Sequence, residues 1–411
     1  MPEPNVPNPA FSLVVFSDDW GRHPSSCQHL IRRFLGRYPV LWVNTIGMRE
    51  PRLDRVTFRR GIEKLRGWFF ARRHPPSDDR SEPAPEIVDP RMWPFFRRAF
   101  DRRMNRRLLL RQLTPRVESL ASPRIALTTI PIVADLVGRL PVDAWVYYCV
   151  DNFSEWPEMH GPTIEMLERR LIERVDVIVA AGERLAERIA KRGRNAVLLP
   201  HGVDYAMWQA ASTRPAEDPL LSCLKDLPRP LVVFWGSVNW QVDDETVAAT
   251  ARAAAPGTVV LIGPVSDCSP KLRQLENVVS TGAVPYESLP QAAGAADVLI
   301  MPYRRHQAVV DAAPLKLLEY LSTDKPVVVC DVPAHRAWAD ALDIAESPEQ
   351  FASLVKTRLE TGLPSAQREA RRRVADESWD NRAAVLEREL AALASRFTLN
   401  ASPDARPGGD S

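Results

Sequence analysis

Short apolar segments of strand length recur along the chain, and most are followed by a stretch whose apolar residues have helical spacing. The apolar segments are continuous rather than alternating, which is typical of parallel strands covered on both faces. In the first half of the chain, strands are predicted at Ser12–Ser17, Val40–Asn44, Arg124–Thr129, Ala144–Val150, Val175–Ala181 and Ala196–Pro200. In the second half, they are predicted at Leu231–Trp235, Thr258–Ile262, Asn277–Thr281, Asp297–Met301 and Pro326–Cys330. The pattern predicts two doubly wound α/β domains.

Helices are predicted between the strands and after the last one. In the first half they are Pro24–Arg37, Pro94–Gln112, Ile132–Arg139, Thr163–Arg174 and Glu183–Lys191. In the second half they are Asp244–Ala255, Glu287–Ala295, Pro314–Ser322, His335–Leu342, Ser347–Glu360, Ser365–Glu377 and Asn381–Phe397. The alternation breaks between residues 48 and 93, a Pro- and Arg-rich stretch that is too long for an ordinary connection. We therefore expect an irregular basic insertion there.

Domain limits follow from changes in composition. Residues 210–229 are rich in turn-forming and charged residues, which predicts a linker between domains at 1–209 and 230–377. Ligands of open α/β sheets bind beyond the carboxyl ends of the strands, so we expect the site in the cleft between the domains. The tail at 398–411 is polar and rich in Pro, Gly and Asp, which predicts disorder.

Overall composition adds expectations about the compartment. Of the 411 residues, 45% are hydrophobic and 26% are charged, as in an ordinary globular protein. No apolar run is long enough to span a membrane, and the first residues lack the pattern of a secretory signal. The five cysteines are odd in number and have no CxxC spacing, as expected in a reducing compartment. We expect a cytoplasmic protein.

Charge is distributed unevenly along the chain. The segment Arg49–Arg116 contains 19 Lys and Arg against 9 Asp and Glu, although the whole chain is only +2. Basic residues interleaved with aromatic ones suit an anionic membrane surface, a nucleic acid or an acidic glycan. We favour membrane contact narrowly over a solvated helix face with a mobile loop. Nucleic acid is not expected, because no recognised binding module accompanies the segment. The aromatic residues are Trp68, Phe69, Phe70, Trp93, Phe95 and Phe96.

The most informative stretch runs from Asp311 through the sequence PLKLLEYLSTDKPVVV. Pro314 suits the first turn of a helix, where its missing N–H is not needed. The amides of Leu315, Lys316 and Leu317 would then be free for an anion. Lys316 adds a positive charge, and Glu319 lies one turn further on. A phosphate near Lys316 and a diol near Glu319 would together fit a nucleotide sugar.

This stretch resembles the signature of GT-B glycosyltransferases, and most closely the retaining, family-four-like group that reads PLKxxEYLAxGKPVV. The resemblance implies that Glu319 binds the ribose of the nucleotide, and that Leu315 and Lys316 bind its diphosphate. Asp311 stands where relatives more often have Glu, a residue that contacts the sugar hydroxyls. The alternative is an ordinary amphipathic helix that leads into a parallel strand.

A second resemblance lies after the first predicted strand. The sequence SDDWGRHPSSCQHL, from Ser17 to Leu30, resembles the S-x-x-W…RPQHL opening of the same group. It implies an acceptor-side loop that contains Asp19, Trp20, His23 and Gln28. The alternative is a helix start capped by Ser25 or Ser26, with no ligand.

Two further elements of the first half match the group. The sequence YYCVDNF, which contains Asp151, resembles VVYDCVDDF and places an acid at a strand end. Asp151 could bind hydroxyls or help accept the proton of the acceptor, although a helix-capping or loop-anchoring role is an equal alternative. The sequence PHGVD, which contains His201, resembles the PNGVD turn. His201 is assigned to the acceptor side, with a structural role as the favoured alternative.

In the second half, Gly236 and Ser237 follow a strand, and a glycine there allows a backbone amide to approach a phosphate. The sequences LIGP and GAVPYESLP resemble family elements that pack around the nucleotide base, and they contain Gly263, Pro264, Val284 and Tyr286. Ser378-Trp379 resembles the start of a closing helix, which implies that 378–397 returns to the N-terminal domain.

Together the resemblances imply an α/β GT-B fold with a C-terminal crossover helix, and a retaining glycosyltransferase. Asp151, Asp311 and Lys316 are the catalytic candidates. No metal or cofactor is expected. The partners are a nucleotide-sugar donor and a glycan or lipid-linked acceptor, in surface polysaccharide synthesis by family resemblance. A nucleotide-sugar 2-epimerase and a catalytically silent scaffold on the same fold are the alternatives.

Overall fold

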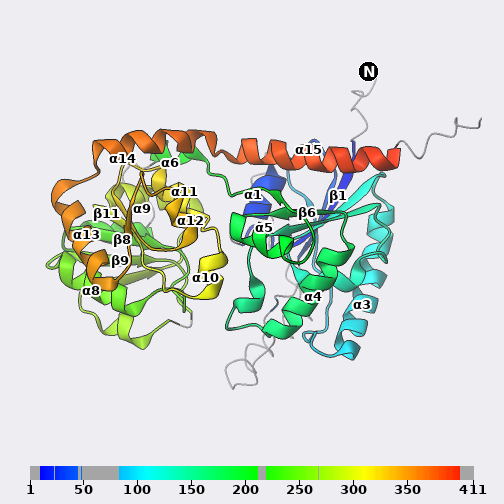
Figure 1. The fold of residues 1–411 in the computed structure, drawn as a ribbon, viewed down its shortest axis with the longest axis horizontal. Helices are drawn as coiled ribbons and strands as arrows, with labels where there is room; N and C mark the ends of the chain where they lie inside the picture. The colour runs from blue at the N-terminus through cyan, green and yellow to red at the C-terminus, as the bar shows by residue number, and fades with distance from the viewer. Residues whose placement is uncertain are drawn as a thin grey trace, which may run out of the picture. The chain divides into compact units, whose positions relative to one another are not determined.

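The computed structural model describes residues 10–22, 24–44, 48, 83–211, 219–266 and 268–398. The chain divides into two compact units (Figure 1). Unit 1 comprises Met1–Leu199 with Ala383–Ser411, and unit 2 comprises Pro200–Arg382. His23 and the aromatic residues Trp68, Phe69 and Phe70 lie outside the described residues.

Unit 1 is built on a seven-stranded sheet in which all neighbouring strands are parallel, in the order β3-β2-β1-β4-β5-β6-β7. Every residue of β1 and β5 is buried, as expected for continuous apolar strands at the centre of a doubly wound sheet. The strands are β1 (Ser12–Ser17), β2 (Val40–Asn44), β3 (Glu86–Val88), β4 (Arg124–Thr128), β5 (Ala144–Cys149), β6 (Val177–Ala180) and β7 (Val197–Leu198).

Helices flank this sheet, and the 3₁₀ turn η1 contacts both α3 and α4. The C-terminal helix α15 (Trp379–Thr398) begins in unit 2 and continues in unit 1. In unit 1 its Glu387 accepts hydrogen bonds from Arg37 at 2.5 Å and from the Tyr38 hydroxyl at 2.6 Å. The remaining elements are α1 (Ser26–Arg32), α3 (Ala99–Glu118), η1 (Pro131–Leu136), η2 (Phe153–Glu155), α4 (Gly161–Arg174) and α5 (Glu183–Ala190).

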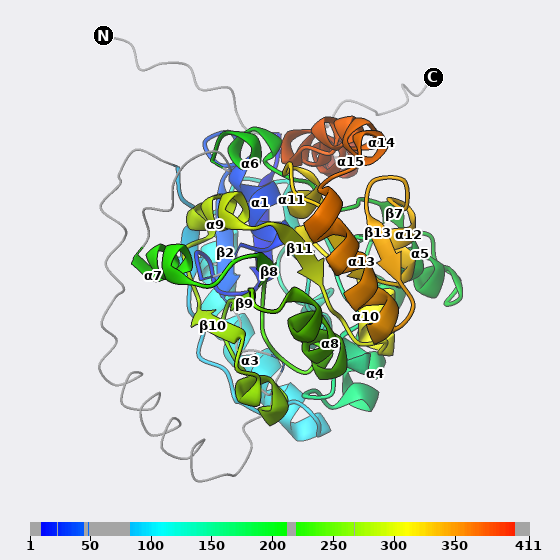
Figure 2. The same ribbon diagram turned by 90° about the vertical axis from the view of Figure 1, so that its left-hand side faces the viewer.

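Unit 2 contains a six-stranded parallel sheet in the order β10-β9-β8-β11-β12-β13. The helices α8 (Asp244–Ala254) and α13 (Pro348–Thr361) pack side by side against it (Figure 2). The strands are β8 (Leu231–Trp235), β9 (Thr258–Ile262), β10 (Val278–Gly282), β11 (Val298–Met301), β12 (Val327–Cys330) and β13 (Asp343–Ala345). The other helical elements are α6 (Tyr205–Ala211), α7 (Pro219–Ser222), η3 (Cys223–Asp226), η4 (Pro270–Gln274), η5 (Tyr286–Ser288), α9 (Leu289–Ala295), α10 (Gln307–Asp311), α11 (Lys316–Leu321), α12 (Pro333–Arg336), α14 (Ser365–Ala370) and η6 (Arg371–Asp376).

The two parallel sheets confirm the predicted fold class, and the differences are local. The helix predicted at Ile132–Arg139 is the short 3₁₀ turn η1, which starts at Pro131 and is followed by Gly138 at φ +71°. Strand β3 lies inside the stretch expected to be irregular. Residues 200–211 belong to unit 2, not to the N-terminal domain, because Trp208 is fully buried in the core of unit 2.

Candidate functional site

The parallel strands of unit 2 end at one edge of the sheet, and the loops after β8, β9 and β10 meet there. Two glycines make this close approach possible. A Cβ atom on Gly236 (φ +137°) would lie 2.0 Å from Nζ of Lys316, and one on Gly263 (φ +143°) would lie 2.0 Å from the carbonyl oxygen of Gly236. Neither position can carry a side chain in this arrangement.

The amide of Gly236 is not directed at a ligand, contrary to the sequence expectation, and neither is that of Gly263. Gly236 N–H donates to the carbonyl of Ile262 at 2.9 Å, and Gly263 N–H donates to that of Gly282 at 2.8 Å. Both amides therefore continue the hydrogen bonding of the sheet. The structure gives Gly236 a different role, which is to make room for the Lys316 ammonium group. Ser237 and Pro264 follow the two glycines, and Val284 follows β10.

Lys316 is the first residue of α11, and its ammonium lies between two aromatic rings. Nζ is 5.0 Å from the ring centroid of Phe234 and 5.3 Å from that of Tyr303. These cation–π contacts hold the charge in place. Among the described residues, no carboxylate lies within ion-pair distance of Lys316, so its charge is available to an anion.

Glu319, one turn further along α11, is buried with only 3% of its surface exposed. The indole N–H of Trp235 donates to Oε2 at 3.0 Å, and the hydroxyl of Tyr286 donates to Oε1 at 2.9 Å. Burial raises the pKa of Glu319 to about 7, although these two hydrogen bonds and the charge of Lys316 act in the opposite direction. The site thus holds a carboxylate that titrates near neutrality.

The start of this helix differs from the prediction. α11 has six residues and begins at Lys316, and the amide of Leu317 donates to the carbonyl of Pro314 at 3.1 Å. Leu317 is therefore not free for an anion, and the helix is too short for a strong dipole. The positive charge of the site comes mainly from Lys316. Asp311 ends the separate helix α10, is buried, and accepts a hydrogen bond from Gln307 at 2.8 Å.

His201 lies in unit 2, whereas the sequence placed it in the N-terminal domain. It is buried, and burial lowers its pKa to about 4, so its imidazole is neutral at physiological pH. The turn that contains it packs against the start of α15, since Val203 N–H donates to the carbonyl of Glu377 at 2.8 Å. A Cβ atom on Gly202 would lie 2.8 Å from the backbone nitrogen of Trp379. These contacts favour the structural alternative for His201.

In unit 1, the predicted acceptor-side loop is held by its own side chains. Ser25 caps α1 by accepting from the amide of Gln28 at 3.3 Å. The side chain of Gln28 donates to Asp18 at 2.6 Å and accepts from the amide of Gly21 at 3.0 Å. Trp20 packs edge-on against Trp42 with ring centroids 4.7 Å apart. Gln28 therefore shapes this loop.

Asp19 and Asp151 lie at the carboxyl ends of β1 and β5. Asp19 forms an exposed ion pair with Arg22 at 3.2 Å. Asp151 accepts from the amide of Asn152 at 2.7 Å, and its carbonyl accepts from the thiol of Cys149 at 3.9 Å. Both carboxylates lie at the edge of the unit 1 sheet where the sequence placed them.

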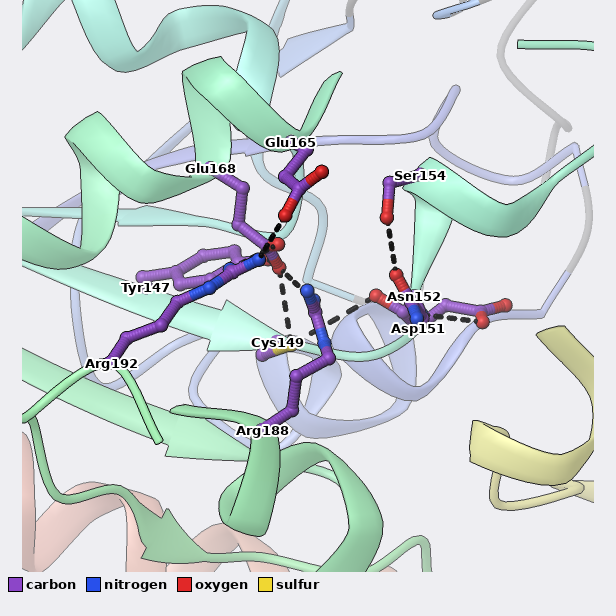
Figure 3. A network of polar contacts seen from close by, with 9 residues as sticks. All are labelled: Tyr147, Cys149, Asp151, Asn152, Ser154, Glu165, Glu168, Arg188 and Arg192. Carbon is purple, nitrogen blue, oxygen red and sulfur yellow. Dashed lines mark hydrogen bonds and ion pairs between the residues drawn. The ribbon is translucent and has the colours of Figure 1, made fainter. Parts of the chain in front are cut away.

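A buried ionic network that the sequence did not indicate lies behind Asp151 (Figure 3). Glu168 of α4 accepts from the hydroxyl of Tyr147 and from Arg192, both at 2.8 Å, and it also pairs with Arg188. Burial alone would raise the pKa of Glu168, but the two arginines and Tyr147 outweigh it and lower the pKa. The network joins α4 and α5 to β5, and only spatial proximity reveals it.

No three His, Cys, Asp or Glu side chains are grouped as metal ligands within the described ranges. The sequence predicted Trp235, which donates to Glu319, only as the last residue of the strand Leu231–Trp235. The signal in the sequence is the Trp itself, because an indole N–H usually has a hydrogen-bond partner when it is buried.

Comparison with known proteins identifies relatives of this chain. Residues 229–361 match the family model described as glycosyl transferases group 1. A Bacillus subtilis protein named as a teichuronic acid biosynthesis glycosyltransferase, TuaH, is 27% identical over 200 residues. That match covers 47% of this chain, and the chain spans about half (49%) of the length of the relative.

Solved structures resemble the fold of most of the chain. Anabaena HepE in complex with UDP and glucose has a TM-score of 0.66 at 12% identity, covering 93% of this chain and 99% of the other. An Escherichia coli structure titled trehalose-6-phosphate, bound with UDP-2-fluoro glucose, has a TM-score of 0.60 at 14% identity, covering 92% and 99%. These likenesses show the two-domain GT-B architecture. The family match shows that residues 229–361 are similar to glycosyl transferases group 1, and the curated relative is a further partial likeness to a glycosyltransferase.

Proposed function

We propose that this protein transfers a sugar from a nucleotide-diphosphate sugar to a glycan or lipid-linked acceptor. The observation that carries the proposal is the juxtaposition of Lys316 and Glu319 at the strand ends of unit 2. Lys316 presents an ammonium beside Gly236, and Glu319 presents a buried carboxylate three residues further on. The solved HepE and E. coli structures contain UDP or a UDP-sugar, which supports a nucleotide-sugar ligand.

The chemistry of transfer explains why these two groups are needed. The bond between C1 of the sugar and the diphosphate oxygen breaks, and negative charge builds up on the departing diphosphate. Lys316 is positioned to stabilise that charge, because a preorganised cation is most effective where charge develops. Glu319 accepts hydrogen bonds from the ribose hydroxyls and so fixes the nucleotide. Asp311 is assigned to the sugar hydroxyls.

We propose that transfer retains the configuration at C1. The acceptor hydroxyl attacks C1 from the face that the diphosphate leaves, and its proton passes to a phosphate oxygen as the new C1–O bond forms. Asp151 binds the acceptor hydroxyl in this scheme. The name of the Bacillus subtilis relative supports an acceptor in the synthesis of a surface polysaccharide.

Two assays test the proposed activity. UDP-, GDP- and ADP-sugars are first screened for an increase in the melting temperature, which is expected for at least one of them. The stabilising nucleotide sugar is then incubated with and without bacterial lipid-linked glycan fractions, and free nucleotide is measured. Acceptor-dependent nucleotide release supports transfer. Equal release without acceptor indicates an epimerase, and binding without release indicates a silent protein.

We also propose that the protein works at the inner face of the cytoplasmic membrane. No helix of the described residues is long and apolar enough to cross a bilayer. Helix α3 instead presents an exposed face with Arg103, Arg107 and Arg111 spaced one turn apart, and Phe100 near its start is 65% exposed. Trp93, just before the helix, is 43% exposed. Arginines beside exposed aromatic rings suit an anionic bilayer surface.

The position of this surface fits a lipid-linked acceptor. Helix α3 connects the parallel strands β3 and β4, so it runs antiparallel to them. Its N-terminal end therefore lies at the carboxyl ends of the strands, on the same side of the sheet as the loops that contain Asp19 and Asp151. A membrane under this edge would bring the acceptor to those loops.

Vesicle sedimentation tests the membrane proposal. The protein should sediment with anionic vesicles, and Trp93→Ser with Phe100→Ser should weaken that binding at least threefold, because the rings no longer enter the interface. Leu198→Ser, at a 41% exposed position on β7, is the matched control and should bind as wild type does. Equal binding to neutral vesicles, or an unchanged double variant, would contradict the proposal.

A further inference from the structure

Glu319 of unit 2 is held by one hydrogen-bond donor on each carboxylate oxygen. Trp235 N–H, at the end of β8, binds Oε2 at 3.0 Å, and Tyr286 O–H, at the start of η5, binds Oε1 at 2.9 Å. An ionised carboxylate has about four acceptor positions. Each oxygen therefore keeps capacity for one further donor, which matches the two hydroxyls of a vicinal diol.

The indole that binds Glu319 is itself fixed. Trp208 stacks on Trp235 with ring centroids 5.2 Å apart and planes at 13°. Tyr320 lies on it at 4.0 Å, and its hydroxyl accepts from the backbone amide of Trp235 at 3.0 Å. All three rings are buried. The indole N–H is therefore aimed at Glu319 with little freedom to rotate.

We propose that Trp235 and Tyr286 are positioning residues that keep the Glu319 carboxylate ionised and oriented to accept both hydroxyls of the nucleotide ribose. This inference rests on the proposed function, in which Glu319 binds the ribose. A protonated carboxyl has one oxygen that must donate, so it cannot accept from both hydroxyls in the same way. Binding of the sugar donor then depends on the proton at Glu319.

The groups around Glu319 set the direction of each expected effect. Burial raises its pKa to about 7, Asp204 also raises it, and Trp235, Tyr286 and Lys316 lower it. Burial and Glu319 raise the pKa of Tyr286, so its phenol stays a hydrogen-bond donor throughout the accessible pH range. Nucleotide-sugar affinity should therefore rise as the pH increases through about 7.

Substitutions should move this transition in opposite directions. Trp235→Phe and Tyr286→Phe each remove a donor that stabilises the ionised form, so the midpoint should shift to higher pH. Asp204→Asn removes a nearby negative charge, so the midpoint should shift to lower pH. Trp338→Phe is the matched control, because it shortens another Trp that packs on the core of unit 2 but lies against Arg373, away from Glu319.

The test is isothermal titration of UDP-glucose, GDP-mannose and ADP-glucose between pH 5.5 and pH 9. A diphosphate sugar is preferred to a free diphosphate, whose terminal phosphate titrates near pH 6. Trp235→Phe should lose about tenfold in affinity at pH 6.5 and recover to within about threefold of wild type at pH 8.5. Trp338→Phe should keep the wild-type midpoint. The 2′-deoxyribose analogue should show a weaker pH response.

The outcomes separate the inference from the function on which it rests. Wild-type protein that binds none of the nucleotide sugars contradicts the proposed function as well. Wild-type binding that is independent of pH, or a loss in Trp235→Phe that is equal at every pH, overturns the positioning role alone. If Trp235→Phe fails to fold, the same comparison of affinity across pH is made with Tyr286→Phe.

Discussion

At the scale of single residues, Lys316 and Glu319 define the proposed nucleotide-sugar site of unit 2. The sequence predicted both from their spacing after Asp311, and the structure places Lys316 beside Gly236 and Glu319 against Trp235 and Tyr286. The partners of Glu319 could not be predicted, because Trp235 and Tyr286 are distant in sequence and look like core or base-packing residues. Gly236 was expected to offer its amide to a phosphate, but that amide donates to Ile262 and continues the sheet.

The buried Glu319 carries a stability cost that can be measured. Its folded pKa of about 7 lies above the usual value of 4.5, so between these values the unfolded chain releases a proton that the folded protein keeps. Stability should fall as pH rises through this window, and a shift of this size corresponds to a few kcal/mol.

Glu319→Gln removes that titration while keeping the shape of the side chain. We expect a higher melting temperature than wild type at pH 8, a smaller difference at pH 5, and loss of stabilisation by nucleotide sugar. The exposed Glu245→Gln on α8 is the control and should leave the pH dependence unchanged. A Glu319→Gln variant that is less stable than wild type at pH 8 would show that the carboxylate is not destabilising.

At the scale of secondary-structure elements, long apolar strands were easiest to predict and short polar ones hardest. Strands such as β1, β8 and β9 have the predicted bounds, because every residue in them is buried. β3 has only three residues, two of them exposed, and β13 is equally short, so neither has a hydrophobic pattern that identifies it. α11 was predicted too long at its start, because Leu315 is the N-cap and the helix begins at Lys316.

Ion pairs between residues that are distant in sequence could not be predicted from the pattern of single elements. Arg188 and Arg192 follow Glu168 by 20 and 24 residues, and each of the three looks like an ordinary polar position, Glu168 on α4, Arg188 on α5 and Arg192 just after α5. Only the packing of α4 and α5 on β5 brings them together. A buried charge that loses its partner is strongly destabilising. This cluster therefore constrains how those elements can pack.

At the scale of the whole molecule, each unit carries part of the proposed reaction. Unit 2 holds the proposed nucleotide-sugar site, with Lys316 and Glu319, and unit 1 holds the proposed acceptor loops, with Asp19 and Asp151. The two-sheet architecture was predictable from the alternation of strands and helices. The assignment of residues 200–211 to unit 2 was not predictable. This segment directly follows the last predicted strand of the N-terminal domain, and only the packing of Trp208 in the core of unit 2 shows where it belongs.

Turnover of a Lys316→Ala variant tests the central claim most directly. If Lys316 stabilises the departing diphosphate, kcat with the stabilising nucleotide sugar and its acceptor should fall about 100-fold or more, corresponding to about 3 kcal/mol of lost transition-state stabilisation. KM should change much less, and Lys316→Arg should recover part of kcat because it restores a positive charge. A folded Lys316→Ala variant with wild-type kcat would contradict the account.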